Sequence, residues 1–193
     1  MTQIQDGTGK GYLAKVDARN KLETFSTSQT EEDYHLKKGS GFNIETPVIT
    51  LTSAAKSGVL YVKNNSVDDI VITGFFNLLG AITGTTSGNM FLYYEFDTVG
   101  GTLIAATTNV VTPVNKRAGG ATTLDATVLY GAQGLTVDSG LKKISSLSTG
   151  TGINPLFVRV ILPKGSSVSV SIQPFTGTTN MSLIAALDCF IDD

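Results

Sequence analysis

The 193-residue chain contains no tryptophan, one cysteine (Cys189) and one histidine (His35), and each scarcity removes a class of chemistry. A single cysteine cannot form an internal disulfide framework, and with no second cysteine or histidine nearby it does not indicate a zinc site. Charged residues make up 16% of the chain, against roughly a quarter in globular chains. Lysine and arginine never form a basic block and the net charge is -2, so we expect no nucleic-acid partner.

Long apolar runs are also missing. None approaches the roughly 18 residues needed to cross a bilayer, and the opening MTQIQDGTGKGY is too polar for a signal peptide. We therefore expect a soluble protein that is made in a cytoplasm and has no membrane partner.

The residue types of catalysis are present without the patterns that would use them. His35 stands beside Glu31, Glu32 and Asp33, no G-x-S-x-G segment occurs, and Cys189 lies in an apolar run. We interpret His35 as a solvated surface residue and Cys189 as a small buried hydrophobe. The sequence predicts no enzyme, no catalytic residue, no cofactor and no metal site; a hydrolase that depends on His35 is the least favoured alternative.

Charge is distributed unevenly and suggests two parts. The chain has 30 charged residues, 14 basic and 16 acidic, and 12 of these 30 fall within residues 1–41. We therefore predict an N-terminal arm, 1–41, and a folded body, 42–193. Within the arm, GYLAKVD and KLETFST alternate apolar and polar residues around ARN, which is typical of a β-hairpin. The next segment, STSQTEEDYHLKKG, has acids first and lysines last and favours one short helix.

The body alternates short apolar runs with turns rich in Gly, Asn, Ser, Thr and Pro, which indicates an all-β fold. We predict an antiparallel β-sandwich, with a jelly roll as the leading topology and a barrel as the alternative. In SVSVSIQ the alternation is cleanest, and Ser167, Ser169 and Ser171 are expected to face water. The predicted strands are 43–52, 58–64, 69–79, 89–97, 102–111, 122–130, 156–163, 167–173 and 181–191.

Three of these strands carry apolar residues at both odd and even positions, although a strand of an isolated sandwich should bury one face and expose the other. Either the arm or a loop covers the second face, or other subunits do. The low charge favours a permanent assembly, and a hairpin of two strands is too unstable to remain undocked. The residues proposed to contact other subunits or a capsid are Tyr12, Leu13, Leu22, Phe25, Phe75, Phe76, Leu79, Tyr93, Tyr94, Ile184 and Phe190.

The arm also resembles a known family. The segment DGTGKGYLAKVDARNKL, Asp6 to Leu22, is similar to the opening of small structural proteins of tailed-bacteriophage virions, and GSGFNI, LYVKN and LPKGSS resemble later elements of those proteins. The resemblance implies a virion protein, of the decoration or auxiliary head type, whose β-sandwich body commonly forms a homotrimer and whose arm attaches to the shell. The implied partners are the major capsid protein or other virion proteins, and the family motif contains no catalytic residue.

Two alternatives to a capsid-surface protein stay open at this point. One is a structural role in the tail or at a fibre base. The other is a glycan-binding or receptor-binding module, for which Tyr93, Tyr94 and Tyr130 are the candidate aromatic residues.

Overall fold

The computed structural model describes residues 15–16, 22–23, 30–52, 55–84, 89–97, 109–132, 142–149, 152–175 and 178–192. The chain divides into two compact units, Met1–Glu31 and Glu32–Asp193. In the first unit, β1 (Lys15–Val16) pairs with β2 (Leu22–Glu23) in antiparallel fashion. The predicted hairpin is therefore confirmed for these four residues.

A short helix precedes the sandwich. It is α1 (Glu31–Lys38), where the sequence predicted one. The helix ends because Gly39 adopts a left-handed conformation with φ of 87°, which glycine tolerates best. The amide N–H groups of Gly39 and Ser40 both donate to the carbonyl of His35 at 2.9 Å, so the end of the helix is capped by its own backbone.

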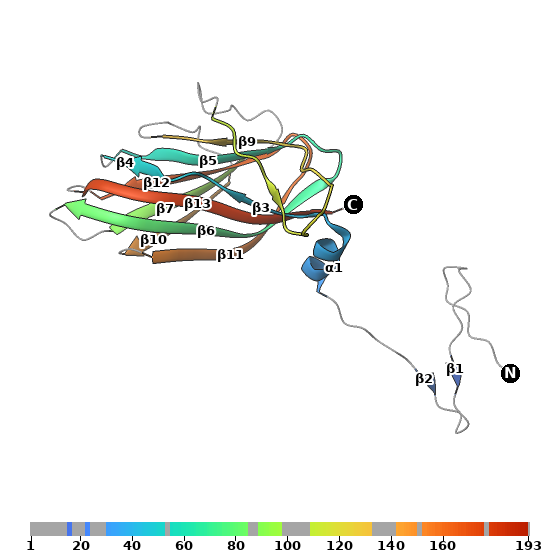
Figure 1. Ribbon diagram of the computed structural model, residues 1–193. Helices are drawn as coiled ribbons and strands as arrows, with labels where there is room; N and C mark the ends of the chain where they lie inside the picture. Colours follow the sequence, from blue (N-terminus) through green and yellow to red (C-terminus); the bar gives the residue numbers. More distant parts are fainter. Residues whose placement is uncertain are drawn as a thin grey trace. The chain divides into compact units, whose positions relative to one another are not determined.

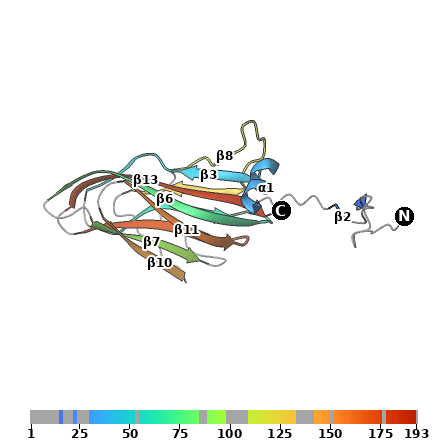
Figure 2. The same cartoon turned by 90° about the horizontal axis from the view of Figure 1, so that it is seen from below.

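Two sheets form the sandwich, and Figures 1 and 2 show them as stacked layers. The first has the order β11-β6-β13-β3-β8, with β4 also paired to β13, and the second has the order β10-β7-β12-β5-β9. Their strands are β3 (Gly41–Glu45), β4 (Ile49–Leu51), β5 (Ser57–Asn64), β6 (Asp69–Gly84), β7 (Asn89–Asp97), β8 (Val114–Asn115), β9 (Ala126–Tyr130), β10 (Lys142–Thr149), β11 (Gly152–Leu162), β12 (Ser167–Pro174) and β13 (Thr178–Asp192).

The eight main strands pair as a nested hairpin. β3 pairs with β13, β5 with β12, β6 with β11, and β7 with β10, always antiparallel. Folding this long hairpin over so that its pairs alternate between the two sheets produces a jelly roll. The predicted fold class is therefore confirmed, and so is the leading topology.

A β-bulge in β6 explains much of the apolar pattern on both faces of this strand. Asp188 of β13 pairs with Gly74 and the next residue, Cys189, pairs with Ile72, so Thr73 is an extra residue in β6. An extra residue reverses which side chains point inward. Ile72 faces the core before the bulge and Phe75 faces it afterwards. The prediction from the sequence assumed strict alternation without a bulge, and it therefore placed Ile72 and Phe75 on opposite faces.

Other strand predictions need correction. Ser167, Ser169 and Ser171 of β12 were predicted to face water, but they are buried, at most 4% exposed. β12 is the central strand, and Ser169 and Ser171 lie between larger residues of the neighbouring strands, including Tyr61 and Tyr93. β10 (Lys142–Thr149) was not predicted from the sequence. Most of the predicted strand 102–111 lies outside the described residues.

Candidate functional site

The outer side of the β11-β6-β13-β3 sheet carries an apolar surface. Leu78 is 44% exposed, Ile153 67% and Phe157 75%, although most large apolar side chains of the described body lie in the core. These residues come from two neighbouring strands, and Ile184 and Ala186 of β13 are partly exposed beside them. We call this surface the apolar face; it comprises Phe76, Leu78, Ile153, Phe157, Ile184 and Ala186.

Strand register places these side chains in rows across the sheet. Leu78 pairs with both Ile153 and Ile184, which makes one apolar row. In the next row, Phe76 pairs with Pro155 and with Ala186, which in turn pairs with Glu45 of β3. The rings of Phe76 and Phe157 meet edge-on, with centroids 5.8 Å apart.

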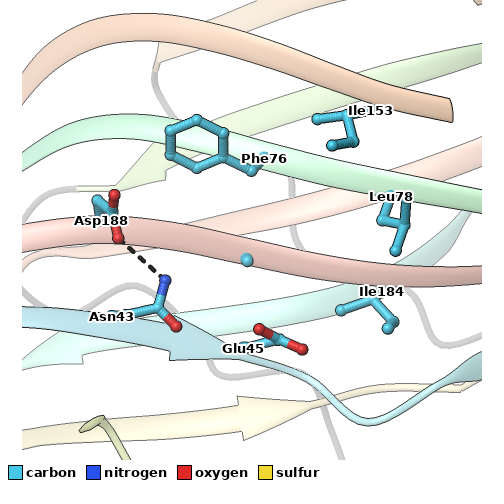
Figure 3. A pocket seen from close by; sticks show the side chains of 8 residues that line it. Asn43, Glu45, Phe76, Leu78, Ile153, Ile184 and Asp188 are labelled. Carbon is cyan, nitrogen blue, oxygen red and sulfur yellow. Dashed lines mark hydrogen bonds between the residues drawn. The ribbon is translucent and has the colours of Figure 1, made fainter.

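A groove of about 300 Å³ runs along this face, between β3 and β11. Figure 3 shows Phe76, Leu78, Ile153 and Ile184 around it. Its other lining residues are Asn43, Glu45, Ala186 and Asp188. The groove is mostly apolar with polar groups along one side, and such a surface suits the side chains of a protein partner.

The polar end of the groove is internally compensated. The Asn43 amide donates to Asp188 Oδ1 at 2.9 Å, and Lys116 Nζ lies 3.3 Å from Asp188 Oδ2 and 3.2 Å from Glu32 Oε1. Burial by itself lowers the pKa of Lys116, but the two carboxylates outweigh burial and raise it. Lys116 therefore stays protonated and fixes the position of Asp188.

α1 packs on this side of the sheet at Phe190. The His35 ring stacks on Phe190 of β13, with centroids 4.2 Å apart, and His35 is 3% exposed. Val71 of β6, which pairs with Phe190, is fully buried. The interpretation of His35 as a solvated residue was therefore wrong. His35 is the buried side chain through which this mostly charged helix packs on the sheet.

His35 also lies between a serine and a carboxylate. Its Nδ1 is 3.1 Å from Ser40 Oγ, and its Nε2 is 4.0 Å from Asp192 Oδ1. These are the residue types of a hydrolase triad, but Ser40 is 4% exposed and does not line the groove. A nucleophile has to reach its substrate, so this arrangement is better explained as the attachment of α1 to the body.

Cys189 behaves as the sequence predicted. It is buried and unpaired by any disulfide. Burial, together with the nearby carboxylate of Asp188, raises the pKa of its thiol to about 12. Since the thiolate is the reactive form, Cys189 is inert near neutral pH.

The structure separates the predicted contact residues into groups. Phe76 and Ile184 lie on the apolar face. Phe75, Leu79 and Tyr94 are in the core between the sheets, at most 2% exposed, so they are not available for contacts and these three assignments are corrected. Phe190 is buried under α1, which is also a correction. Leu22 lies in β2, while Tyr12, Leu13 and Phe25 lie outside the described residues.

Tyr93 lies on the outer side of the other sheet. Its hydroxyl donates to Gln173 Oε1 at 3.0 Å, and Lys56 Nζ lies 4.8 Å from its ring centroid while bonding to Glu95 at 2.7 Å. The Phe91 ring is 6.0 Å from Tyr93. Of the three tyrosines considered for glycan binding, Tyr94 is excluded, because it is in the core and accepts a bond from Asn77 at 2.8 Å.

The sequence reading missed Ile153 and Phe157. Both lie in GINPLFVRV, where the predicted strand began only at residue 156 because Gly152 and Pro155 suggested a turn. The alternation of Ile153, Pro155 and Phe157 was a detectable signal. Proline is acceptable there because β11 is an edge strand.

Comparisons with known proteins leave the family open. No protein-family model and no curated protein matches the chain. Among solved structures, one match is a chain from a full particle of Israeli acute paralysis virus heated to 63 degrees. It has 12% sequence identity and a TM-score of 0.34, and the match covers 100% of this chain and 81% of that one. A TM-score this low carries no argument about function, and the jelly roll is assigned here from the strand pairing.

Among the described residues, no helix is both long and apolar enough to cross a membrane.

Proposed function

We propose that the chain is a non-enzymatic structural protein of a tailed-phage virion, which decorates or cements the capsid surface as a homo-oligomer, with a trimer favoured. The observation that carries the proposal is the apolar face. An exposed, contiguous apolar surface on a soluble domain marks an interaction site. Its three most exposed side chains are Leu78, Ile153 and Phe157.

The fold and the N-terminal segment agree with this role. The jelly roll occurs in viral capsid proteins and also in lectins, so the fold by itself does not choose a function. The segment Asp6 to Leu22 resembles virion proteins, and that resemblance favours the capsid over the tail or fibre base. The partner is then the major capsid protein or another virion protein.

Cementing follows from the energetics of the apolar face. Burying one large apolar side chain contributes roughly 1.5–3 kcal/mol. Several such contacts, repeated in every copy of an oligomer, make simultaneous release rare, because each copy holds the others near their sites. This function requires stable binding and no chemical step.

The test is co-sedimentation of the purified protein with virus particles that lack it. The natural chain should sediment with the particles, and a Leu78→Ser, Phe157→Ser variant should be lost from them. Val67→Ser is the matched control, because Val67 is 77% exposed in the turn before β6, away from the apolar face. Natural protein that stays in the supernatant would contradict the proposal.

A glycan-binding or receptor-binding module is the second candidate function, and the aromatic group around Tyr93 favours it. Phe91 is 39% exposed and its ring lies 4.8 Å from that of Phe175, with Gln173 beside them. Aromatic rings next to an amide can bind a sugar by stacking and hydrogen bonding. Saturable glycan binding that Tyr93→Ala abolishes would support this candidate over the structural role.

A further inference from the structure

One carboxylate of the groove has no partner. Glu45, on β3, is exposed and lines the groove, and its side chain makes no hydrogen bond or ion pair with any residue in the described part of the chain. The other acid of the groove, Asp188, is bonded to Asn43 and Lys116. Lys116 already contacts two carboxylates, those of Asp188 and Glu32. The groove therefore keeps an excess of negative charge, and Glu45 carries it.

Apolar side chains surround this carboxylate. Ala186 of β13 pairs with Glu45 on one side and with Phe76 on the other. Val114 of β8, the strand next to β3, is 62% exposed, and Val48, just before β4, is 64% exposed. Glu45 thus lies among exposed apolar side chains, where a partner that binds the apolar face also covers it.

The groove is long and has two different ends. The small side chain of Ala186 lies between Phe76 and Glu45, which come from the two neighbouring strands. From Asp188 at the polar end to Ile184 at the apolar end, the groove follows β13 for four residues, or about 13 Å (Figure 3). A lysine or arginine side chain has the matching form, because it combines an aliphatic stem with a charged end.

We propose that the groove binds a basic side chain, lysine or arginine, which the virion protein that holds this chain presents between apolar residues. The stem lies on Ala186 beside Phe76, and the charged group pairs with Glu45. A partner that covers the apolar face removes water from Glu45, and a carboxylate without water or a cation is destabilising. A basic side chain in the partner avoids that loss. The inference rests on the proposed function and adds the chemistry of the partner.

The described charges argue against a second copy of this chain as the occupant. In the six strands of this sheet, as the structure describes them, Arg159 is the one basic residue, and it already has an interaction within the chain. Lys116, directly after β8, is held by Asp188 and Glu32. Two copies stacked through their apolar faces would therefore bring no available cation of either sheet to Glu45. A different chain, with an apolar and basic surface, is complementary to the face.

The first experiment measures the affinity of the full chain for virus particles that lack it, by co-sedimentation over a dilution series. Glu45→Lys should raise the apparent dissociation constant about 30-fold and Glu45→Gln about tenfold. Added salt should weaken binding of the natural chain more than binding of Glu45→Gln. Asp125→Lys, the same charge reversal at an exposed position before β9, is the matched control and should stay within about twofold. Urea unfolding of each variant shows whether it is folded.

The second experiment does not depend on virus particles. The peptide acetyl-Leu-Arg-Leu-amide is titrated into the isotope-labelled full chain and followed by nuclear magnetic resonance, with acetyl-Leu-Glu-Leu-amide as the matched peptide. The arginine peptide should shift the amide signals of Glu45 and Ala186 and bind about tenfold more tightly than the glutamate peptide. Glu45→Lys should remove this preference.

Contrary results overturn the inference. Peptides that bind equally or not at all would do so, and so would a Glu45→Lys variant whose oligomer has a lower mass in light scattering, because a second copy would then occupy the face. The inference and the proposed function can fail separately. If Glu45→Lys binds particles as well as Asp125→Lys does, the groove assignment fails and the virion role stands. If the natural chain does not co-sediment, the virion role fails, and the peptide titration decides the groove assignment.

Discussion

Asn64, at the end of β5, connects two turns that are far apart in the sequence. Its Nδ2 donates to the carbonyl oxygens of Asp68 and Leu162, each at 2.8 Å, and its Oδ1 accepts from the Ser66 N–H at 2.8 Å. The side chain is fully buried. One side-chain amide therefore joins the β5–β6 turn to the end of β11. All three of its hydrogen bonds are made with main-chain groups.

Asn64→Ala should lower the free energy of unfolding by about 3–5 kcal/mol. Three main-chain groups lose their partner, and a buried group left without one costs about 1–3 kcal/mol. The bond to Leu162 is buried, while those to Asp68 and Ser66 are partly buried. Water can replace the partner at the partly buried sites, so the expected total lies below the sum of three full costs. A domain is stable by only about 5–15 kcal/mol, so this loss is large.

Urea unfolding followed by circular dichroism measures the change, at one protein concentration because oligomers gain stability by mass action. Asn65→Ala is the control: the neighbouring Asn65 makes its bond, to Thr127 Oγ1 at 3.0 Å, at an exposed position. It should lose less than about 1 kcal/mol. The reasoning is refuted if the two alanine variants differ by less than about 1 kcal/mol.

Three further predictions concern the outer side of the first sheet. Because the pKa of Cys189 is about 12 in the fold against 9.0 for an ordinary thiol, the unfolded chain loses this proton first; the unfolding free energy should fall as pH rises from 9 to 12, and Cys189→Val should flatten that fall. The raised pKa of Lys116 means that its stabilising contacts with Asp188 and Glu32 are fully present at pH 8 and are lost as pH rises above 10.5 through that raised pKa, so Lys116→Met should be less stable than the natural chain at pH 8, and this difference in unfolding free energy should shrink as pH rises above 10.5 in chemical denaturation. His35→Ala removes the ring stacked on Phe190 and should cost about 1–3 kcal/mol and speed proteolysis within α1, whereas equal cleavage rates would contradict the packing role.

Most of the secondary structure, but not all of it, could be predicted from the sequence. Alternating apolar residues and turn residues predicted most of the β-strands and the short helix, because these patterns depend on local backbone preference and burial. β10, KKISSLST, escaped detection because it contains only two large apolar residues. It is a strand because it pairs along its whole length with β7, from Lys142 opposite Phe96 to Thr149 opposite Asn89. A contact between distant segments leaves no trace in local composition.

The candidate contact residues show the same limit in more detail. Strict alternation cannot reveal that Thr73 is an extra residue in β6, and this residue exchanges the two faces of the strand from Gly74 to Leu79. For this reason Phe75 and Leu79 entered the core. His35 was misread because the neighbours that bury it, Phe190 and Ser40, are supplied by the folded chain rather than by its flanking acids.

The sequence by itself determined that this chain forms β-strands, because alternating apolar residues and turn residues are short-range patterns, and the apolar run around Cys189 predicted that its single thiol is buried. Only the tertiary structure decided which of the apolar residues stay on the surface. That choice depends on strand register, on one bulge and on where α1 packs, and all three are fixed by contacts between residues far apart in the chain.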